Sequence, residues 1–479
     1  MIRRSVRALR LGPPGLVVAC FGAALFAAVF AVGNDQLPMS GGITGGVVAI
    51  GFAAIPVLAY VAIKNPLALP FALWAGLVPL ENILAVKGAS LEKFLGLATA
   101  GAAVIHVLAR RRVARLPAAV YAWLIFLAYA GASLAWAQPS DASVPLLVMF
   151  ASTLLAVVAV ALVPPSEEDL RWICGAIVIG GLVTAAFAAV GASHFQQKGI
   201  DPRIELSNGT VTTDPNFSAA TLLMPAIVSA VCAIAVRSVP IRIACAAGAM
   251  ACTFGIAVFA SRGGLIALAG GIAYVFLRAR QRLVMLPVGA LALSTIFAFP
   301  SVLARFTNPH LRDGSGRYDI WHVGFAAFKA HWAFGNGFGT FGEAYRQAIL
   351  DTYVPLDQLR QTQSHNCLLQ FAVELGIAGV AIALVAGYLQ LTSLRTIPPS
   401  AGGWFSARVA CEASAVAVVI DSFTINLLAW KFTWLCFAMM WMLRAAYVRR
   451  VAERGEPAGA PARVELDAPR VALPAPLRT

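Results

Sequence analysis

Long apolar segments, separated by short polar or charged stretches, dominate the chain. Runs such as Leu16–Val32, Ala118–Ala137 and Ala219–Val236 approach or reach the roughly 20 residues that an α-helix needs to cross a bilayer. They predict an all-α, polytopic membrane helix bundle with about 12–14 transmembrane helices, of which short members such as 66–85 can be re-entrant. The predicted segments lie near 15–32, 44–63, 66–85, 91–109, 118–137, 144–163, 171–191, 216–236, 241–260, 262–277, 283–300, 366–391, 406–428 and 430–447.

Composition supports this prediction. Hydrophobic residues make up 59% of the 479 residues and charged residues only 12%, whereas a soluble domain carries about 25% charged residues. The net charge of +14 does not indicate nucleic-acid binding, because the arginines gather in clusters between apolar runs, as in cytoplasmic loops. These clusters are Arg3, Arg4, Arg7 and Arg10; Arg110–Arg112 and Arg115; Arg278, Arg280 and Arg282; and Arg449, Arg450 and Arg454.

The same clusters predict the orientation in the membrane. An even number of spans with both termini in the cytoplasm places most basic loops inside. It also places two long loops outside, at about 192–215 and about 301–365; the second holds four of the six histidines and is expected to contain short helices. Long loops in a compact bundle are usually functional. Residues 1–453 are thus expected to form one membrane domain with this loop inserted, followed by a disordered cytoplasmic tail at 454–479.

Arg262 is the first candidate for chemistry. It lies in the sequence Ser261–Gly264, between two apolar segments, at a turn that the predicted topology places outside. A charge in a spanning segment costs about 2.5–3.5 kcal/mol at the bilayer centre and tends to be retained for a reason. The guanidinium either reaches the lipid headgroups or offers its bidentate fork to a diphosphate.

Arg317 is the second candidate, within Gly314–Trp321. Asp313 or Ser315 is expected to cap a helix whose aromatic residues recur at helical spacing and which lies along the membrane surface. Arg317 then stands in the first turn, where backbone N–H groups also favour an anion. The alternative is a helix-end arginine paired with Asp313 or Asp319. The aromatic residues are Trp321, Phe325, Phe328 and Trp332.

His365 is the third candidate. It lies in Ser364-His365-Asn366, where the outer loop re-enters the membrane. A histidine at this boundary is able to accept a proton from a hydroxyl near pH 7, although a lone histidine also serves as a structural hydrogen-bonding residue. Upstream, glycines alternate through Gly335–Gly342 and predict a tight turn or a close approach to a ligand. No Gly-Lys-Ser/Thr follows, which excludes a nucleotide P-loop.

Further polar residues accompany these three. Asn216, in Asp214-Pro215-Asn216, is expected to cap the next helix, and Arg203 upstream is a candidate anion contact. Asp421, Glu374 and Lys431 lie in or beside predicted spans and are expected to form buried pairs or a relay. The histidines and cysteines have no spacing typical of a metal site or a disulfide framework, so no metal and no cofactor is predicted.

Taken in order, these motifs resemble the O-antigen ligase and polymerase superfamily. The resemblance rests on Ser-Arg-Gly at 261–263, Gly-Arg…Ile-Trp at 316–321, Gly-x-Gly-x-Gly at 335–339, and His-Asn at 365–366 followed by Glu374–Gly379. It covers roughly residues 200–390; the N-terminal half is similar only as apolar helices. The resemblance implies a metal-independent, inverting glycosyltransferase at the periplasmic face of the bacterial inner membrane, which uses undecaprenyl-diphosphate-linked glycan as donor.

Roles follow from the resemblance motif by motif. Arg262 and Arg317 would bind and neutralise the diphosphate leaving group, and His365 would be the general base on the acceptor hydroxyl or would position it. Arg203, Asn216 and Asn366 are taken as further substrate contacts. The list of expected partners is completed by the acceptor, which is a lipid A-core sugar for a ligase and a second lipid-linked repeat unit for a polymerase, and by membrane lipids.

Two alternatives stay open at this point. The motifs do not separate a ligase from a polymerase of O-antigen or exopolysaccharide. A transporter or flippase of lipid-linked sugars is a different class, which should line a cavity with charge across the depth of the membrane. The candidate charges cluster instead at the predicted outer face, and this favours an enzyme.

Overall fold

The computed structural model describes residues 60–81, 85–86, 89–138, 140–193, 214–278, 317–352, 354, 363–428 and 430–454. The predicted spans near 15–32 and 283–300, most of the span near 44–63, Arg203, Asp313, Ser315 and residues 455–479 of the tail lie outside the described residues.

Among the described residues, eight helical segments are long and apolar enough to cross a membrane, and each coincides with a predicted span. An apolar helix suits this environment because it satisfies every backbone hydrogen bond internally. The eight segments are α4 (Leu91–Arg110), α5 (Ala118–Ala132) with the 3-10 turn η5 (Ser133–Ala135), α6 (Ser143–Ala161), α7 (Glu167–Ser193), α8 (Pro215–Thr221) with α9 (Leu223–Ala235), α10 (Val239–Val258), α16 (Cys367–Thr392) and α17 (Gly403–Asp421).

The other predicted segments within the described residues are helical too. The segment predicted at 66–85 forms a shorter apolar stretch, composed of η3 (Leu67–Phe71), α3 (Ala72–Leu77) and η4 (Val78–Leu80). The segments at 262–277 and 430–447 are α11 (Arg262–Arg278) and α18 (Lys431–Glu453). A small hairpin of two strands with two residues each, β1 (Ala85–Val86) and β2 (Ala89–Ser90), is an addition to the predicted all-α fold. The polytopic helix bundle is therefore confirmed.

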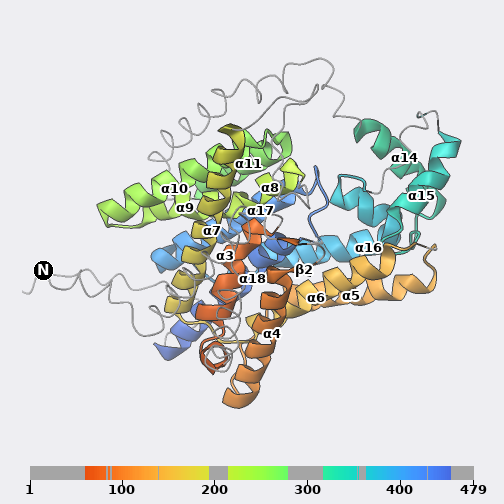
Figure 1. The fold of residues 1–479 in the computed structure, drawn as a ribbon. Coiled ribbons are helices and arrows are strands. Elements are labelled where there is room, and N and C mark those ends of the chain that lie inside the picture. Colours follow the sequence, from red (N-terminus) through yellow and green to blue (C-terminus); the bar gives the residue numbers. More distant parts are fainter. Residues whose placement is uncertain are drawn as a thin grey trace, which may run out of the picture.

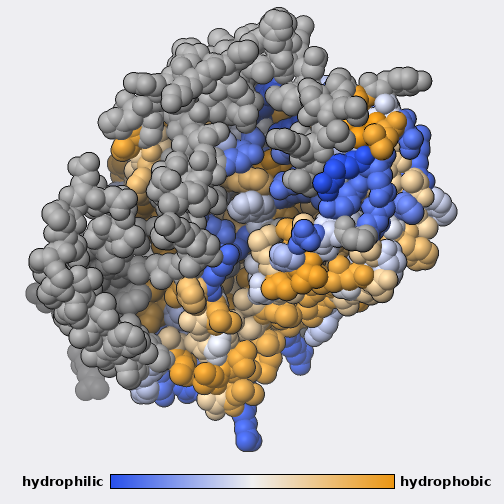
Figure 2. All heavy atoms as spheres, turned by 45° about the vertical axis from the view of Figure 1, so that its right-hand side comes forward, coloured by the Kyte–Doolittle hydropathy of each residue, from blue (hydrophilic) through white to orange (hydrophobic). Residues whose placement is uncertain are grey.

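The helices pack into one bundle, in which α16 contacts α5, α11 contacts α17, and α10 contacts α9 (Figure 1). Four buried aromatic side chains pack together at its centre. Trp123 of α5 contacts Trp434 of α18, Phe126 of α5 contacts Phe150 of α6, and Phe150 contacts Trp434. Large apolar side chains also cover much of the outside of the bundle (Figure 2). This surface is what a bundle in contact with lipid requires, since lipid does not penalise exposed apolar groups.

Two short helices of the predicted outer loop lie beside α16 (Figure 1). They are α14 (Arg317–Ala330) and α15 (Phe341–Ala348), the latter followed by the turn η8 (Ile349–Asp351). A small apolar core, separate from that of the bundle, joins both helices to Val373 of α16. The helix predicted after Gly316 is confirmed, with Arg317 in its first turn. Trp321 packs against the small core and donates to the Ser364 carbonyl, whereas Phe325 is exposed. Trp332, expected on the same helix, lies beyond its end at Ala330 and is also exposed.

A kink in α16 allows backbone hydrogen bonds between this helix and the segment that joins α14 to α15. Gly376 has φ +64°, so the helical hydrogen-bonding pattern breaks there. The carbonyls of Val373 and Glu374 accept instead from the backbone N–H groups of Asn336 (3.0 Å) and Gly337 (2.7 Å). A Cβ on Gly376 would lie 2.4 Å from the Ala333 carbonyl. Glycine is required at this position both for its positive φ and for the close approach of the two backbones.

The glycine-rich segment forms the tight turn that the sequence predicts. Gly335, Gly337 and Gly339 all have positive φ, a conformation that glycine adopts without steric cost. The turn is anchored by Glu374, whose carboxylate accepts from the N–H groups of Gly339 (2.9 Å) and Phe341 (3.3 Å). The glycine-rich segment therefore packs against α16 of the same protein.

Candidate functional site

The turn after α17 is the place where the candidate residues meet. Asp421, the last residue of α17, is 1% exposed. Its backbone carbonyl accepts from the Thr424 N–H (2.8 Å), and its Oδ1 accepts from the Thr424 hydroxyl (2.8 Å). These bonds close a tight turn over residues 421–424, here called the Asp421 turn. A buried carboxylate is costly unless positive charge or hydrogen bonds compensate it.

Arg262 lies next to this turn in the chain, because Gly263, which follows it, packs against the turn. A Cβ on Gly263 would lie 2.1 Å from Thr424 Oγ1 and 2.9 Å from Asp421 Oδ1. The start of α11 therefore rests directly on the Asp421 turn, which no larger residue at 263 would allow. Ser261 caps this helix end, since its hydroxyl oxygen accepts from the Gly264 N–H (3.2 Å). Arg262 is the first residue of α11 and is half-buried.

Arg317 belongs to a different helix, α14. It is the first residue of α14 and is half-buried. Its positive charge acts on the Asp421 carboxyl. Opposite charges attract more strongly where the surroundings have a low dielectric, as at this buried carboxyl. The start of α14 therefore lies near enough to the Asp421 turn for the charge of Arg317 to act on Asp421.

His365 is brought to the turn by the next residues. The Cys367 N–H donates to the Ser422 carbonyl (2.8 Å), which ties the start of α16 to the Asp421 turn. Asn366 is the N-cap of α16: its Oδ1 accepts from the N–H groups of Leu368 (3.1 Å) and Leu369 (3.2 Å). His365 itself has φ +51°. Non-glycine residues adopt this left-handed conformation rarely, and such strain clusters at functional sites.

The structure thus brings together Arg262, Arg317 and His365, which are far apart in sequence, around one buried turn. The two guanidinium groups supply positive charge suited to a diphosphate. The imidazole supplies a group able to take a proton from a hydroxyl. Arrangements of this kind support group transfer with an anionic leaving group.

Asn216 links the start of α8 to the residue before α11 through its side-chain amide. It is 8% exposed; its Oδ1 accepts from the Ser261 hydroxyl (2.9 Å) and its Nδ2 donates to Asp214 Oδ1 (2.9 Å). The expectation that Asn216 is an N-cap is wrong. Asp214 caps α8, accepting from the Asn216 N–H (2.8 Å), with Pro215 in the first helical position; proline suits that position because its missing N–H would have no helical partner there.

Glu374 and Lys431 do not behave alike. Lys431, which is buried, forms an ion pair with the half-buried Glu81, just after η4, as expected of a charge within a bundle. For Glu374 the expected charge pair is wrong: its partners among the described residues are the glycine-rich turn and the Gln370 amide. Carboxylates are able to use backbone N–H groups in place of a cation when these donors are fixed in space.

Other polar residues of the site were not foreseen. Thr424 and Ser422 shape the Asp421 turn and receive the starts of α11 and α16. Gln370 lies one turn inside α16 and bonds to the Ser364 backbone. Asp421, a charge in an apolar segment, was the one sequence signal for this place. The residues between 421 and 430 carry no pattern that indicates a turn on which the starts of α11 and α16 meet.

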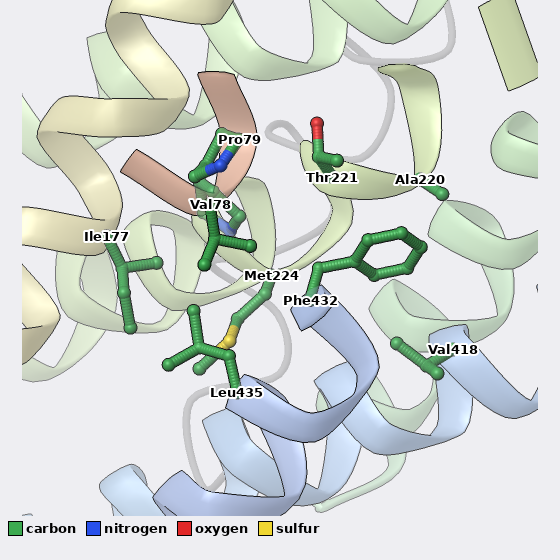
Figure 3. A pocket seen from close by; sticks show the side chains of 10 residues that line it. Val78, Pro79, Ile177, Ala220, Thr221, Met224, Val418, Phe432 and Leu435 are labelled. Atoms are coloured by element: carbon green, nitrogen blue, oxygen red, sulfur yellow. The ribbon is translucent and has the colours of Figure 1, made fainter. Parts of the chain in front are cut away.

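A small pocket elsewhere in the bundle is not part of this site. Its walls are apolar, with Met224, Phe432 and Leu435 among them, and Thr221 supplies the one hydroxyl of the ten lining side chains (Figure 3). Binding sites combine apolar walls with several convergent polar groups. Among the residues that the structure describes, no group of three or more metal-ligating side chains is present.

The far ends of the same helices carry the basic clusters. Arg278, at the end of α11, lies 4.0 Å from Glu412 of α17, and Arg408 donates to the same carboxylate (2.8 Å). Arg450 of α18 pairs with Glu167 of α7. Since α11 and α17 each run from this basic end to the Asp421 turn, the candidate site and the basic clusters lie at opposite ends of the bundle.

Comparison with known protein families gives one match. Residues 247–384 match the family model described as O-Antigen ligase, which confirms the resemblance drawn from the motifs. The matched segment contains Arg262, Arg317 and His365 and extends beyond the kink at Gly376. A comparison with curated protein sequences finds no match.

Proposed function

We propose that this protein is an inner-membrane glycosyltransferase, because residues 247–384 match the family model described as O-Antigen ligase. It moves a glycan from undecaprenyl diphosphate to a sugar hydroxyl of lipid A-core, at the periplasmic face. The observation that carries this proposal is the meeting of Arg262, Arg317 and His365 at the Asp421 turn.

The position of the site supports the periplasmic face. Basic residues concentrate on the cytoplasmic side of membrane proteins, and here the ends of α11 and α18 that carry Arg278 and Arg450 lie away from the Asp421 turn. We propose that residues 1–453 form the membrane domain, with the loop at about 301–365 in the periplasm and residues 454–479 as a cytoplasmic tail.

The reaction is a displacement at the anomeric carbon. The acceptor hydroxyl oxygen forms the new glycosidic bond as the bond between the anomeric carbon and the diphosphate oxygen breaks, and undecaprenyl diphosphate leaves. His365 takes the proton of the hydroxyl, and this assistance contributes about 10²–10⁴-fold. Attack on the face opposite the leaving group inverts the anomeric configuration.

The arginines act on the leaving group. Arg262 and Arg317 bind the diphosphate oxygens and neutralise the charge that grows as the bond breaks, and preorganised donors of this kind supply much of the rate enhancement of many enzymes. Two guanidinium groups meet this need, so we propose that the reaction proceeds without a metal ion or a cofactor. Asn366, Asn216 and Arg203 are proposed as further contributors to substrate binding, Asn216 through its hold on Ser261.

The experiment that tests the proposal reconstitutes the purified protein in proteoliposomes with a labelled undecaprenyl-diphosphate glycan. One sample receives lipid A-core as acceptor and a second receives only further lipid-linked glycan. We expect labelled glycan on lipid A-core in the first sample. Longer lipid-linked chains in the second sample would identify a polymerase instead. Movement of intact lipid-linked glycan across the bilayer with no new glycosidic bond would identify a flippase and contradict the proposal.

A further inference from the structure

We infer that Gln370 and Glu374 are positioning residues that fix His365 for proton transfer. This inference rests on the proposed function, because it takes His365 as the group that accepts the proton of the acceptor hydroxyl. The two side chains lie one turn apart on α16 and are 9% and 2% exposed. They connect the glycine-rich turn to the backbone on which His365 stands.

The residue before His365 is held from several sides. The Ser364 N–H donates to Gln370 Oε1 (3.0 Å), and the Ser364 carbonyl accepts from the Trp321 indole N–H (3.0 Å). Its hydroxyl donates to the Asn366 carbonyl (2.6 Å). Ser364 is fully buried, so each of these bonds is protected from water and costly to break.

This network explains how His365 keeps its unusual backbone. A left-handed conformation at a non-glycine residue costs about 1–3 kcal/mol and persists only where the surroundings determine it. Ser364 is fixed on one side by Gln370 and Trp321. On the other side, the Cys367 N–H is bound to Ser422. Between two fixed neighbours, the His365 backbone has little freedom to relax, so the direction in which its side chain leaves the backbone is fixed.

Gln370 is suited to this position by its amide. One end of the group accepts from the Ser364 N–H, and the other donates to Glu374 Oε1. Glutamine is the side chain of this length that both donates and accepts through a planar amide. Glu374 in turn is fixed by the N–H groups of Gly339 and Phe341. The chain of bonds therefore runs from the glycine-rich turn, through Glu374 and Gln370, to Ser364.

The same helix contains a matched glutamine for comparison. Gln390 is fully buried near the other end of α16; its Oε1 accepts from the Trp441 indole N–H (2.8 Å) and its Nε2 donates to the Met440 sulfur. Its side chain also makes two hydrogen bonds, but it lies about five turns from Gln370. Loss of Gln390 therefore tests the cost of removing a buried glutamine from α16 without touching His365.

The test compares Gln370→Leu with Gln390→Leu in the reconstituted transfer assay. We expect Gln370→Leu to lower kcat about 10- to 100-fold with little change in the acceptor KM, because displaced catalytic groups lose rate and not binding. Gln390→Leu should lower the thermal midpoint about as much as Gln370→Leu does, but leave kcat within about twofold of the wild-type value. Wild-type kcat in folded Gln370→Leu, or an equal loss in both variants, would overturn the inference.

A swapped pair keeps the test decisive if Gln370→Leu folds poorly. In Gln370→Glu/Glu374→Gln, the new carboxylate accepts from the Ser364 N–H and from the new amide, whose oxygen still accepts from the Gly339 N–H; the Phe341 N–H loses its acceptor. We expect this double variant to recover part of the kcat that Gln370→Glu alone loses. If the double variant folds and is no more active than the single variant, donor and acceptor pairing is not what matters, and the inference is wrong.

Amide hydrogen exchange separates this inference from the proposed function. Exchange in the peptide that spans Ser364–Asn366 should be faster in Gln370→Leu than in wild type, and unchanged in Gln390→Leu. This readout needs no substrate. If wild-type protein transfers no glycan, the proposed function fails; if exchange at Ser364 is unchanged by Gln370→Leu, the positioning network fails.

Discussion

The two ends of α11 carry arginines in contrasting surroundings. Arg278, at one end, lies against Glu412 and Tyr274, in a network that Arg408 completes. Arg262, at the other end, adjoins the Asp421 turn, which also binds the start of α16 and is influenced by the charge of Arg317. The first arrangement ties neighbouring helices together. The second gathers positive charge beside His365, whose backbone is strained.

The contrast shows what an arginine at a helix end does. Arg408 is 6% exposed and Glu412 3%, and a buried ion pair that is fully hydrogen-bonded is chiefly a structural feature. At the Asp421 turn, the starts of α11 and α16 meet, and the charge of Arg317 from α14 acts on Asp421; these segments are well separated in sequence. Such convergence of charges and a proton acceptor is the arrangement that catalysis requires. The predictions below address each end of this comparison.

The largest expected effect is at His365. His365→Asn keeps a residue that tolerates the left-handed conformation but removes the base, so kcat should fall about 10²–10⁴-fold with the thermal midpoint nearly unchanged. The control is His106→Asn, because His106 of α4 contacts the Ile63 carbonyl (2.7 Å), away from the Asp421 turn. Initial rates of glycan transfer measure both. Full activity in His365→Asn would remove the proposed base.

The second prediction concerns the basic end. Arg408→Leu leaves Glu412 without its 2.8 Å partner, and breaking a buried ion pair costs about 3–5 kcal/mol. We expect a clearly lower thermal midpoint, measured in detergent, and a kcat of the folded protein within about twofold of wild type. A loss of kcat comparable with that of His365→Asn would show that the two ends do not differ in function.

The smallest effect is expected behind the site. Asn216→Ala removes the acceptor of the Ser261 hydroxyl and the donor to Asp214. The start of α11 should loosen, with a loss of about 1–2 kcal/mol in stability and about tenfold in kcat. The control is Ser229→Ala, a fully buried residue of α9 whose hydroxyl has no hydrogen-bond partner among the described residues. Equal rates in the two variants would contradict the role assigned to Asn216.

Much of the fold follows from local pattern. Apolar runs long enough to cross a bilayer become helices because lipid offers no partner for the backbone, and α4, α10 and α16 lie where the sequence predicts them. The start of α14 at Arg317 and the glycine-rich turn are local features as well. These features need only neighbours in sequence.

The site depends on contacts that local pattern does not encode. That Asp421 receives Gly263 and Arg317, and that Glu374 binds a turn 35 residues away, follows from how the helices pack. The capping residue of α8 was misassigned within a local motif, since Asp214 and Asn216 are both good caps and Pro215 settles the choice. The kink at Gly376 was not predicted, because glycine within an apolar helix is usually tolerated without a break.

The most direct test of the central claim compares the two arginines of α11. Arg262→Gln and Arg278→Gln remove the same charge at opposite ends of one helix, about 24 Å apart at 1.5 Å per residue. Release of undecaprenyl diphosphate during transfer to lipid A-core is measured in proteoliposomes. The account predicts a loss of about 10²–10³-fold in kcat/KM for Arg262→Gln and a change within about twofold for Arg278→Gln. Equal rates for the two variants would contradict it.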